Sequence, residues 1–199
     1  MILVYHNITL KYNNENEVDI FHFFAQMLTV WLSKKQVVNL KNYADEKQQI
    51  VITFDDGYKG IKNFALPILK LFNFPCEIFI VEDFLNNNNC LSRTELGKIV
   101  NNNTHLQYHS KSHKNLCDIE NEAELNDEIV CPDSLKELDK DGFEYFAYPY
   151  WKYNDKAYNI VKKFYRGARS GNGHGDCGKF AMNSIKVLNK INLGEIINE

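Results

Sequence analysis

The stretch from Ile50 to Tyr58 has the sequence IVITFDDGY. Its apolar, largely β-branched first half is typical of a buried strand, and Asp55-Asp56-Gly57 is a turn signal at the carboxyl end of that strand. In α/β folds, ligands and catalytic groups lie in the loops that follow the carboxyl ends of strands. Two adjacent carboxylates repel each other unless a cation or a proton separates their roles. The alternative interpretation is a solvent-exposed turn without a function. This stretch alone does not favour either a functional site or such a turn.

A second stretch, from His105 to His113, has the sequence HLQYHSKSH and places His109 and His113 four residues apart after another strand-like run. On a helical turn, this spacing puts both imidazoles on one face, where they can bind one metal ion. Neutral imidazole is a common ligand of zinc and related metals. A carboxylate from the first stretch would complete a set of two His and one carboxylate, with positions left for water and substrate. The two stretches together predict a metal site.

Three segments resemble the motifs of the NodB-homology polysaccharide deacetylases, carbohydrate esterase family four. They are Thr53–Tyr58, His109–His113 and Phe146–Tyr150, in the family's order. The resemblance extends from Met1 to about Tyr165 and is poor beyond that point. It implies a distorted, incomplete (β/α) barrel in a single domain that spans residues 1–199. Strands that alternate with helices along the chain favour parallel β/α units as well.

The resemblance also implies a role for each residue of the site. Asp56, His109 and His113 would bind one divalent metal ion, with Zn²⁺ as the expected ion and Co²⁺, Ni²⁺ or Mn²⁺ as alternatives. Asp55 would be the general base for metal-bound water, and the backbone N–H of Tyr150 would donate to the oxyanion. The implied activity is removal of an N-acetyl group from a sugar, either in a glycan or linked to a nucleotide or a carrier.

The acid that protonates the leaving amine is the least defined part of the site. The family's C-terminal Leu-x-His motif is absent, since the tail has Leu188-Asn189-Lys190 instead. His6 resembles the N-terminal Tyr-His of the circularly permuted branch that deacetylates poly-N-acetylglucosamine. His174, within a glycine-rich segment, is the competitor, although it could also be an ordinary loop residue. We favour His6 because it follows the first predicted strand directly.

Two more positions depart from the family's pattern. Ala147 stands where the family has an Arg that orients the catalytic Asp, and Arg166 or Arg169 could supply that charge unless both are surface residues. Trp151 replaces the usual Gly, and its indole could stack on a sugar ring or pack against a neighbouring loop. The substrate-binding candidates are Tyr58, Trp151 and His174.

These departures leave alternatives to an N-deacetylase. One is a catalytically weakened relative that binds sugars without turnover. Another keeps the chemistry but changes the bond, as an O-acetyl esterase or a deformylase acting on a related carbohydrate. A panel of substrates scored by the acid released would distinguish them.

Composition limits the classes of protein to consider. The chain has 199 residues, 44% of them hydrophobic, which predicts one substantial core. A net charge of -3 without a basic cluster argues against nucleic acid as a partner, and no apolar run approaches the ~20 residues of a membrane span. Five widely spaced cysteines fit a reducing compartment. If Met1 is the native start, we expect a cytoplasmic protein; its oligomeric state is undetermined.

Periodicity predicts several further elements. Asp19 is a candidate N-cap for a helix, and Ser92 with Glu95 forms a candidate capping box. Other helices are expected at 61–72, at 155–164, and in two pieces within 122–138. Residues 167–178, with five glycines, are expected to form an irregular loop, and 185–188 a last strand. The first helix carries an apolar stripe that we interpret as core packing, formed by Phe21, Phe24, Leu28 and Trp31.

Overall fold

The computed structural model describes residues 1–44, 48–171, 178–189 and 191–198. The strands are β1 (Ile2–Tyr5), β2 (Asn7–Thr9), β3 (Glu17–Asp19), β4 (Gln36–Val37), β5 (Gln49–Phe54), β6 (Cys76–Ile80), β7 (Thr104–Tyr108), β8 (Tyr145–Ala147), β9 (Gly167–Gly171) and β10 (Met182–Lys186). The α-helices are α1 (Ile20–Leu32), α2 (Leu66–Phe72), α3 (Arg93–Ile99), α4 (Glu122–Ile129), α5 (Asp133–Lys136), α6 (Asp155–Phe164) and α7 (Leu193–Asn198).

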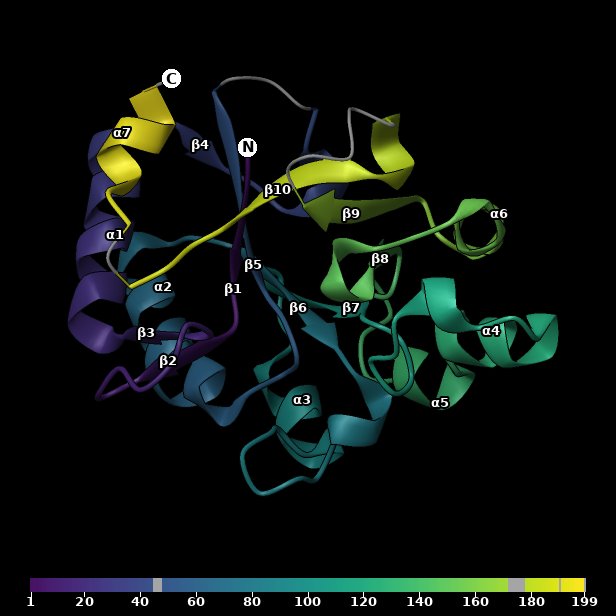
Figure 1. Ribbon diagram of the computed structural model, residues 1–199. Coiled ribbons are helices and arrows are strands. Elements are labelled where there is room, and N and C mark those ends of the chain that lie inside the picture. Colours follow the sequence, from purple (N-terminus) through teal and green to yellow (C-terminus); the bar gives the residue numbers. More distant parts are fainter. Residues whose placement is uncertain (45–47, 172–177, 190, 199) are drawn as a thin grey trace.

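Seven parallel strands close into a ring at the centre of the molecule (Figure 1). Their order around the ring is β1-β10-β9-β8-β7-β6-β5, and β5 pairs with β1 to close it. The short β4 adds to the start of β5, and β2 pairs with β3 outside the ring. The predicted (β/α) barrel is confirmed. It is incomplete in the sense that it has one strand fewer than the eight of a (β/α)₈ barrel.

Side chains along each strand alternate between the inside of the barrel and its helix-covered outside. The apolar residues of the inside form one cluster, which includes Ile2, Val51, Phe79, Tyr145 and Ala147. The intervening residues, such as Leu3 and Ile52, belong to the larger cluster between the strands and the helices. The same alternation, continued to the carboxyl ends of the strands, brings His6, Asp55, His109 and Lys186 to the mouth of the barrel.

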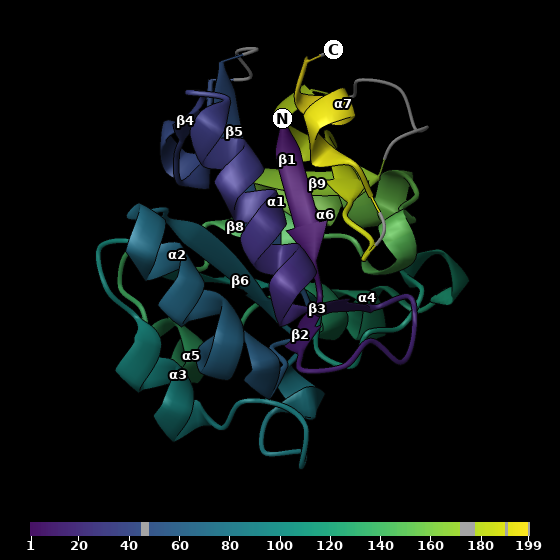
Figure 2. The same cartoon turned by 90° about the vertical axis from the view of Figure 1, so that its left-hand side faces the viewer.

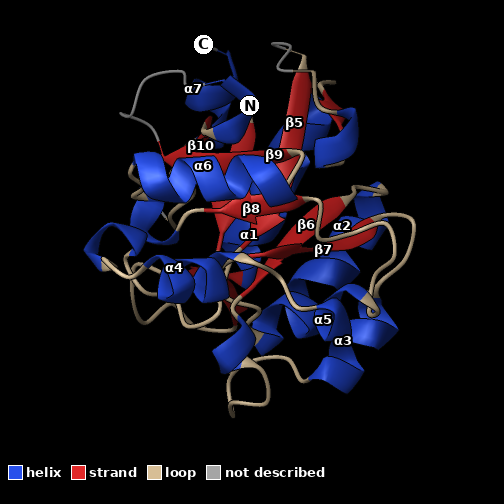
Figure 3. Ribbon diagram, turned by 90° about the vertical axis from the view of Figure 1, so that its right-hand side faces the viewer, coloured by secondary structure: helices blue, strands red, loops and turns tan. Residues whose placement is uncertain are grey.

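The helices cover the outside of the ring. Figure 2 shows α1 beside α2 and α7, and Figure 3 shows α6 lying across β8 and β9. Asp19 caps α1 by accepting hydrogen bonds from the N–H groups of Phe21 and His22, and Ser92 with Glu95 forms the predicted capping box of α3. The helix at 155–164 has the predicted bounds. Among the described residues, no helix has the length and apolar character needed to cross a lipid bilayer.

The apolar stripe of α1 faces solvent, so its assignment to the core was wrong. Phe21 is 79% exposed and Trp31 is 56% exposed, whereas α1 packs on the barrel through Phe23, Met27 and Val30. The helix carries two apolar faces with the same helical spacing. Because both satisfy the 3.6-residue period, periodicity alone could not identify the buried one.

The expected loop over residues 167–178 was also wrong, because its first part is the barrel strand β9. Its glycines allow close packing rather than a turn. A Cβ at Gly167 would lie 2.7 Å from the carbonyl oxygen of Lys179. Glycine within a strand marks such close approaches, and here it made a buried strand resemble a loop in the sequence.

Candidate functional site

A pocket of about 360 Å³ opens at the mouth of the barrel. Asp55 and Asp56 follow β5, the two imidazole ligand candidates follow β7, and three aromatic residues follow β8. Parallel strands all end at the same rim, so residues far apart in the chain converge there. The lining residues are His6, Glu15, Asn16, Asp55, Asp56, His109, His113, Tyr148, Tyr150, Trp151 and Lys186.

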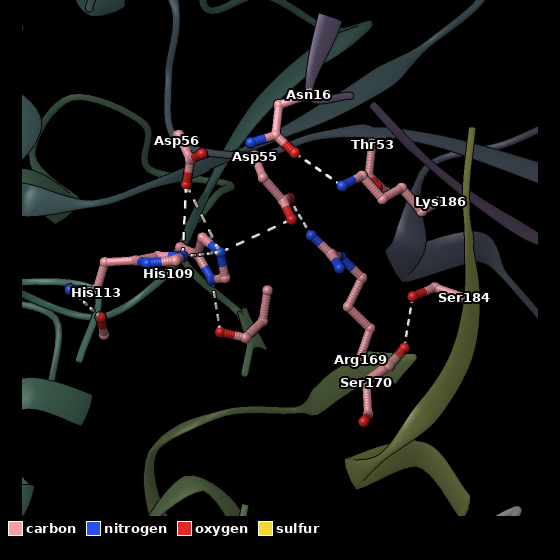
Figure 4. Close-up of polar contacts among 12 residues, drawn as sticks. Asn16, Thr53, Asp55, Asp56, His109, His113, Arg169, Ser170, Ser184 and Lys186 are labelled. Atoms are coloured by element: carbon pink, nitrogen blue, oxygen red, sulfur yellow. Dashed lines mark hydrogen bonds and ion pairs between the residues drawn. The ribbon is translucent and has the colours of Figure 1, made fainter. Parts of the chain in front are cut away.

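Asp56, His109 and His113 form a cluster with metal-site geometry (Figure 4). One ligand atom from each lies within 4.8 Å of the others. The Asp56 Oδ1 atom is 3.6 Å from His113 Nε2 and 3.9 Å from His109 Nε2, and the two Nε2 atoms are 3.2 Å apart. The three predicted ligands therefore face one point.

The expected helical turn for the two histidines was wrong, since residues 109–113 form an irregular loop. Ser110 and His113 have left-handed backbone conformations, with φ of 74° and 60°. The His113 N–H donates to the Ser110 Oγ at 2.9 Å, which holds the loop. The four-residue spacing brings the rings together through this tight loop rather than through a helical face.

His109 is oriented as a neutral ligand. Its Nδ1 lies 2.8 Å from the Ala147 carbonyl oxygen and donates to it, which leaves the lone pair of Nε2 free toward Asp56. Burial lowers the pKa of His109 to about 3, against the opposing charge of Asp55. Burial also lowers the pKa of His113. Both imidazoles are therefore held in the form that binds metals.

The environment of Asp56 is suited to binding a cation. Its Oδ1 atom is buried and accepts no hydrogen bond within the described part of the chain. Burial, followed by the charge of Asp55, raises the pKa of Asp56 to about 7. A bound cation would satisfy the orphaned oxygen and hold Asp56 ionised. Two imidazoles and one carboxylate form a ligand set suited to Zn²⁺ and its neighbours, so these residues fit a divalent metal ion.

Asp55 is held differently from its neighbour. Its Oδ1 accepts a charged hydrogen bond from Nη2 of Arg169 (Figure 4). Arg169 is fully buried in β9, and its Cζ lies 4.5 Å from the centroid of the Phe79 ring. Burial acts to raise the pKa of Asp55, but Arg169 and then His109 outweigh it and leave that pKa below its ordinary value. The other candidate, Arg166, is exposed and bonds to Glu144.

The remaining predicted residues have different positions. His6 lines the pocket, and burial lowers its pKa to about 4 against the charge of Asp55. Tyr58 does not line the pocket; it borders an adjoining groove beside the β2–β3 segment. His174 lies outside the described residues. Sequence reasoning missed Asn16 and Lys186, although alternation along the last strand could have indicated Lys186.

Trp151 lies between the pocket and the neighbouring strand β9. Its indole lines the pocket, and it also packs directly on Gly171 of β9. Tyr150 and Trp151 both have left-handed backbone conformations, with φ of 55° and 61°. Ser170 Oγ donates to the Trp151 carbonyl at 3.0 Å, which ties this loop to β9.

Gly171→Ala is expected to lower the free energy of unfolding by about 1–3 kcal/mol, because a Cβ there would overlap the indole of Trp151. Urea unfolding and tryptophan fluorescence would measure the loss and the displacement of the indole. Gly97→Ala is the matched control, since the nearest atom to its Cβ is Leu138 Cδ2 at 3.9 Å and its helical position should make it neutral or stabilising. Equal stability of both variants would contradict this account of β9.

Comparisons with known proteins agree with this geometry. Residues 42–166 match the family model described as polysaccharide deacetylase. A Streptococcus pyogenes deacetylase, solved with acetate, has a TM-score of 0.86 at 19% identity, covering 99% of this chain and 96% of that one. A polysaccharide deacetylase of Bacillus cereus has a TM-score of 0.83 at 21% identity, covering 99% and 67%.

The IcaB protein of Ammonifex degensii has a TM-score of 0.79 at 17% identity, covering 94% of this chain and 90% of that one. At these identities the likeness establishes the fold. A comparison with curated protein sequences found no match.

Proposed function

The chain belongs to the polysaccharide deacetylase family, and we propose that it removes the N-acetyl group from an N-acetylated sugar with the aid of one divalent metal ion. The observation that carries this proposal is the cluster of Asp56, His109 and His113 beside an ionised Asp55, at the mouth of a barrel pocket. Zn²⁺ is the proposed ion, because the ligand set combines two nitrogen donors with one carboxylate.

A cation bound there would polarise the acetyl carbonyl and make water a better nucleophile. Asp55 is the proposed general base: Arg169 holds its carboxylate ionised, and the Asp55 Oδ2 atom is 3.7 Å from the Nε2 of His109, beside the ligand cluster. It would accept the proton of the attacking water. The backbone N–H of Tyr150 is the proposed donor to the oxyanion.

His6 is the proposed acid that gives a proton to the departing amine. Its position at the end of β1, in the same pocket as Asp55, supports this role. Its low pKa in this structure means that it is neutral at neutral pH. It would therefore have to gain a proton during turnover before it can donate one.

Arg169 bears on the alternative of a weakened sugar-binding relative. That alternative was motivated in part by the loss of the motif Arg at Ala147. The pairing of Arg169 with Asp55 supplies the missing charge from another strand, and this favours an active enzyme.

Acetate release from N-acetylated sugars is the direct test of this function. We expect release from at least one member of a panel of chitooligosaccharides and nucleotide-linked N-acetylglucosamine. Chelation should reduce it to background and Zn²⁺ should restore it, with Co²⁺, Ni²⁺ and Mn²⁺ tested in parallel. O-acetylated and N-formylated sugars in the same panel would reveal an esterase or a deformylase.

Circular dichroism of the chelated protein is the control, because the loss must not come from unfolding. Full activity in protein shown by elemental analysis to be metal-free would contradict the metal-dependent mechanism. No acid released from any sugar by folded, metal-loaded protein would contradict the enzyme itself.

A further inference from the structure

Lys186 is a cation that lines the pocket but forms no direct ion pair with Asp55, Asp56 or Glu15. It is the last residue of β10, and its inward position follows the same alternation as His6 on the neighbouring β1. Its side chain is half-buried and lines the pocket. Lys186 is therefore within reach of a substrate that enters the pocket.

The ammonium of Lys186 is held by a neutral group. Its Nζ donates to the Asn16 Oδ1 at 2.7 Å (Figure 4), and no carboxylate of the described residues lies within ion-pairing distance of it. The amide fixes the direction of the side chain without neutralising its charge. An ammonium has three N–H donors, so two remain for a ligand.

The acids of the pocket have other partners. Asp55 is paired with Arg169, and Asp56 faces the metal-ligand cluster, where a divalent cation would outweigh its charge. Lys186 is thus not the direct partner of either carboxylate. Glu15 also lines the pocket but is exposed at its rim. A half-buried charge without a counter-ion favours a ligand of opposite charge.

We propose that Lys186, positioned by Asn16, binds a phosphate or carboxylate group on the sugar whose acetamido group is hydrolysed. This inference rests on the proposed deacetylase function and specifies its substrate as an anionic sugar. Lys186 lines the same pocket as the Asp56–His109–His113 cluster, so one sugar in that pocket could contact both. Trp151 lines the same pocket and offers a surface for the ring.

Paired substrates that differ in the anionic group test this assignment. N-acetylglucosamine 1-phosphate and N-acetylmuramic acid are compared with methyl N-acetylglucosaminide, which is neutral. We expect kcat/KM to be at least about tenfold higher for one or both anionic substrates, consistent with a charge-assisted hydrogen bond. The two anionic substrates distinguish a phosphate from a carboxylate, and the preference should weaken as salt is added.

Variants then assign the preference to Lys186. Lys186→Met should remove it while leaving the neutral substrate almost unchanged, and Lys186→Arg should keep most of it. Lys98→Met, an exposed lysine of α3, changes the net charge equally and should behave as the wild type. Equal kcat/KM for neutral and anionic substrates would overturn the inference, as would an equal loss for both in Lys186→Met.

A binding measurement separates failure of this inference from failure of the proposed function. Glucosamine 1-phosphate and methyl glucosaminide cannot lose an acetyl group, so their affinity for the zinc-loaded protein is independent of turnover. Tighter binding of the phosphate, lost in Lys186→Met, would support the anion site even if no substrate released acetate. Equal affinity of the two sugars would overturn it.

Discussion

Asp55→Asn and Asp56→Asn should both lower activity strongly but by different routes, although they alter adjacent carboxylates. Asp55→Asn is expected to retain the metal ion and to lower kcat by roughly 10²–10⁴-fold, the usual contribution of a general base. Asp56→Asn is expected to lose the metal, because it removes the anionic oxygen that faces both imidazoles. Elemental analysis of the purified variants and acetate release would measure the two effects separately.

The unfolding midpoint of both variants serves as the control, since Asp55→Asn also removes the partner of a buried arginine. Activity is therefore compared at a temperature at which each variant remains folded. If Asp55→Asn lost the metal while Asp56→Asn kept it, the roles of the two acids would be exchanged. If both kept metal and activity, neither would belong to the reaction.

Arg169→Met should lower the free energy of unfolding by about 3–5 kcal/mol, the cost of leaving one member of a buried ion pair alone. Asp55 and Arg169 are both almost fully buried, and the Arg169 Nε and Nη1 atoms find no other partner among the described residues. The carboxylate would then be buried without its cation. Urea unfolding of the metal-free protein is the measurement.

Arg166→Met is the matched control. The guanidinium of Arg166 is exposed and forms an ion pair with Glu144, which should contribute less than about 1 kcal/mol to the free energy of unfolding. The double variant Asp55→Asn, Arg169→Met removes both charges and should be more stable than the sum of the single effects predicts. Equal losses in Arg166→Met and Arg169→Met, or strict additivity in the double variant, would contradict the ion-pair account.

The sequence predicted the parts of the molecule that depend on local signals. The capping box of α3 and the full span of α6 were correct, because capping residues and helical periodicity lie within a few residues of each other. The acids after β5 and the imidazoles after β7 were found because their residue types and order match a known pattern. The structure brings all four into one pocket.

What could not be predicted depends on contacts between distant segments. Arg169, the partner of Asp55, lies 114 residues further along the chain. It belongs to β9, whose glycine-rich sequence resembles that of a loop. Which face of α1 is buried depends on how the helix packs against the barrel, because both apolar faces of α1 satisfy the same helical period. The convergence of His109 and His113 depends on left-handed residues at Ser110 and His113, which the spacing does not reveal.

Closure of the ring between β1 and β5 has a consequence for self-association. An open sheet ends in strands whose free N–H and C=O groups can recruit a strand from another molecule, which is the first step toward fibrils. In the described part of this chain, only the two-residue β4 and the short β2–β3 pair lie outside the ring. The native barrel therefore offers little template for amyloid-like growth, and such growth would require the ring to open first.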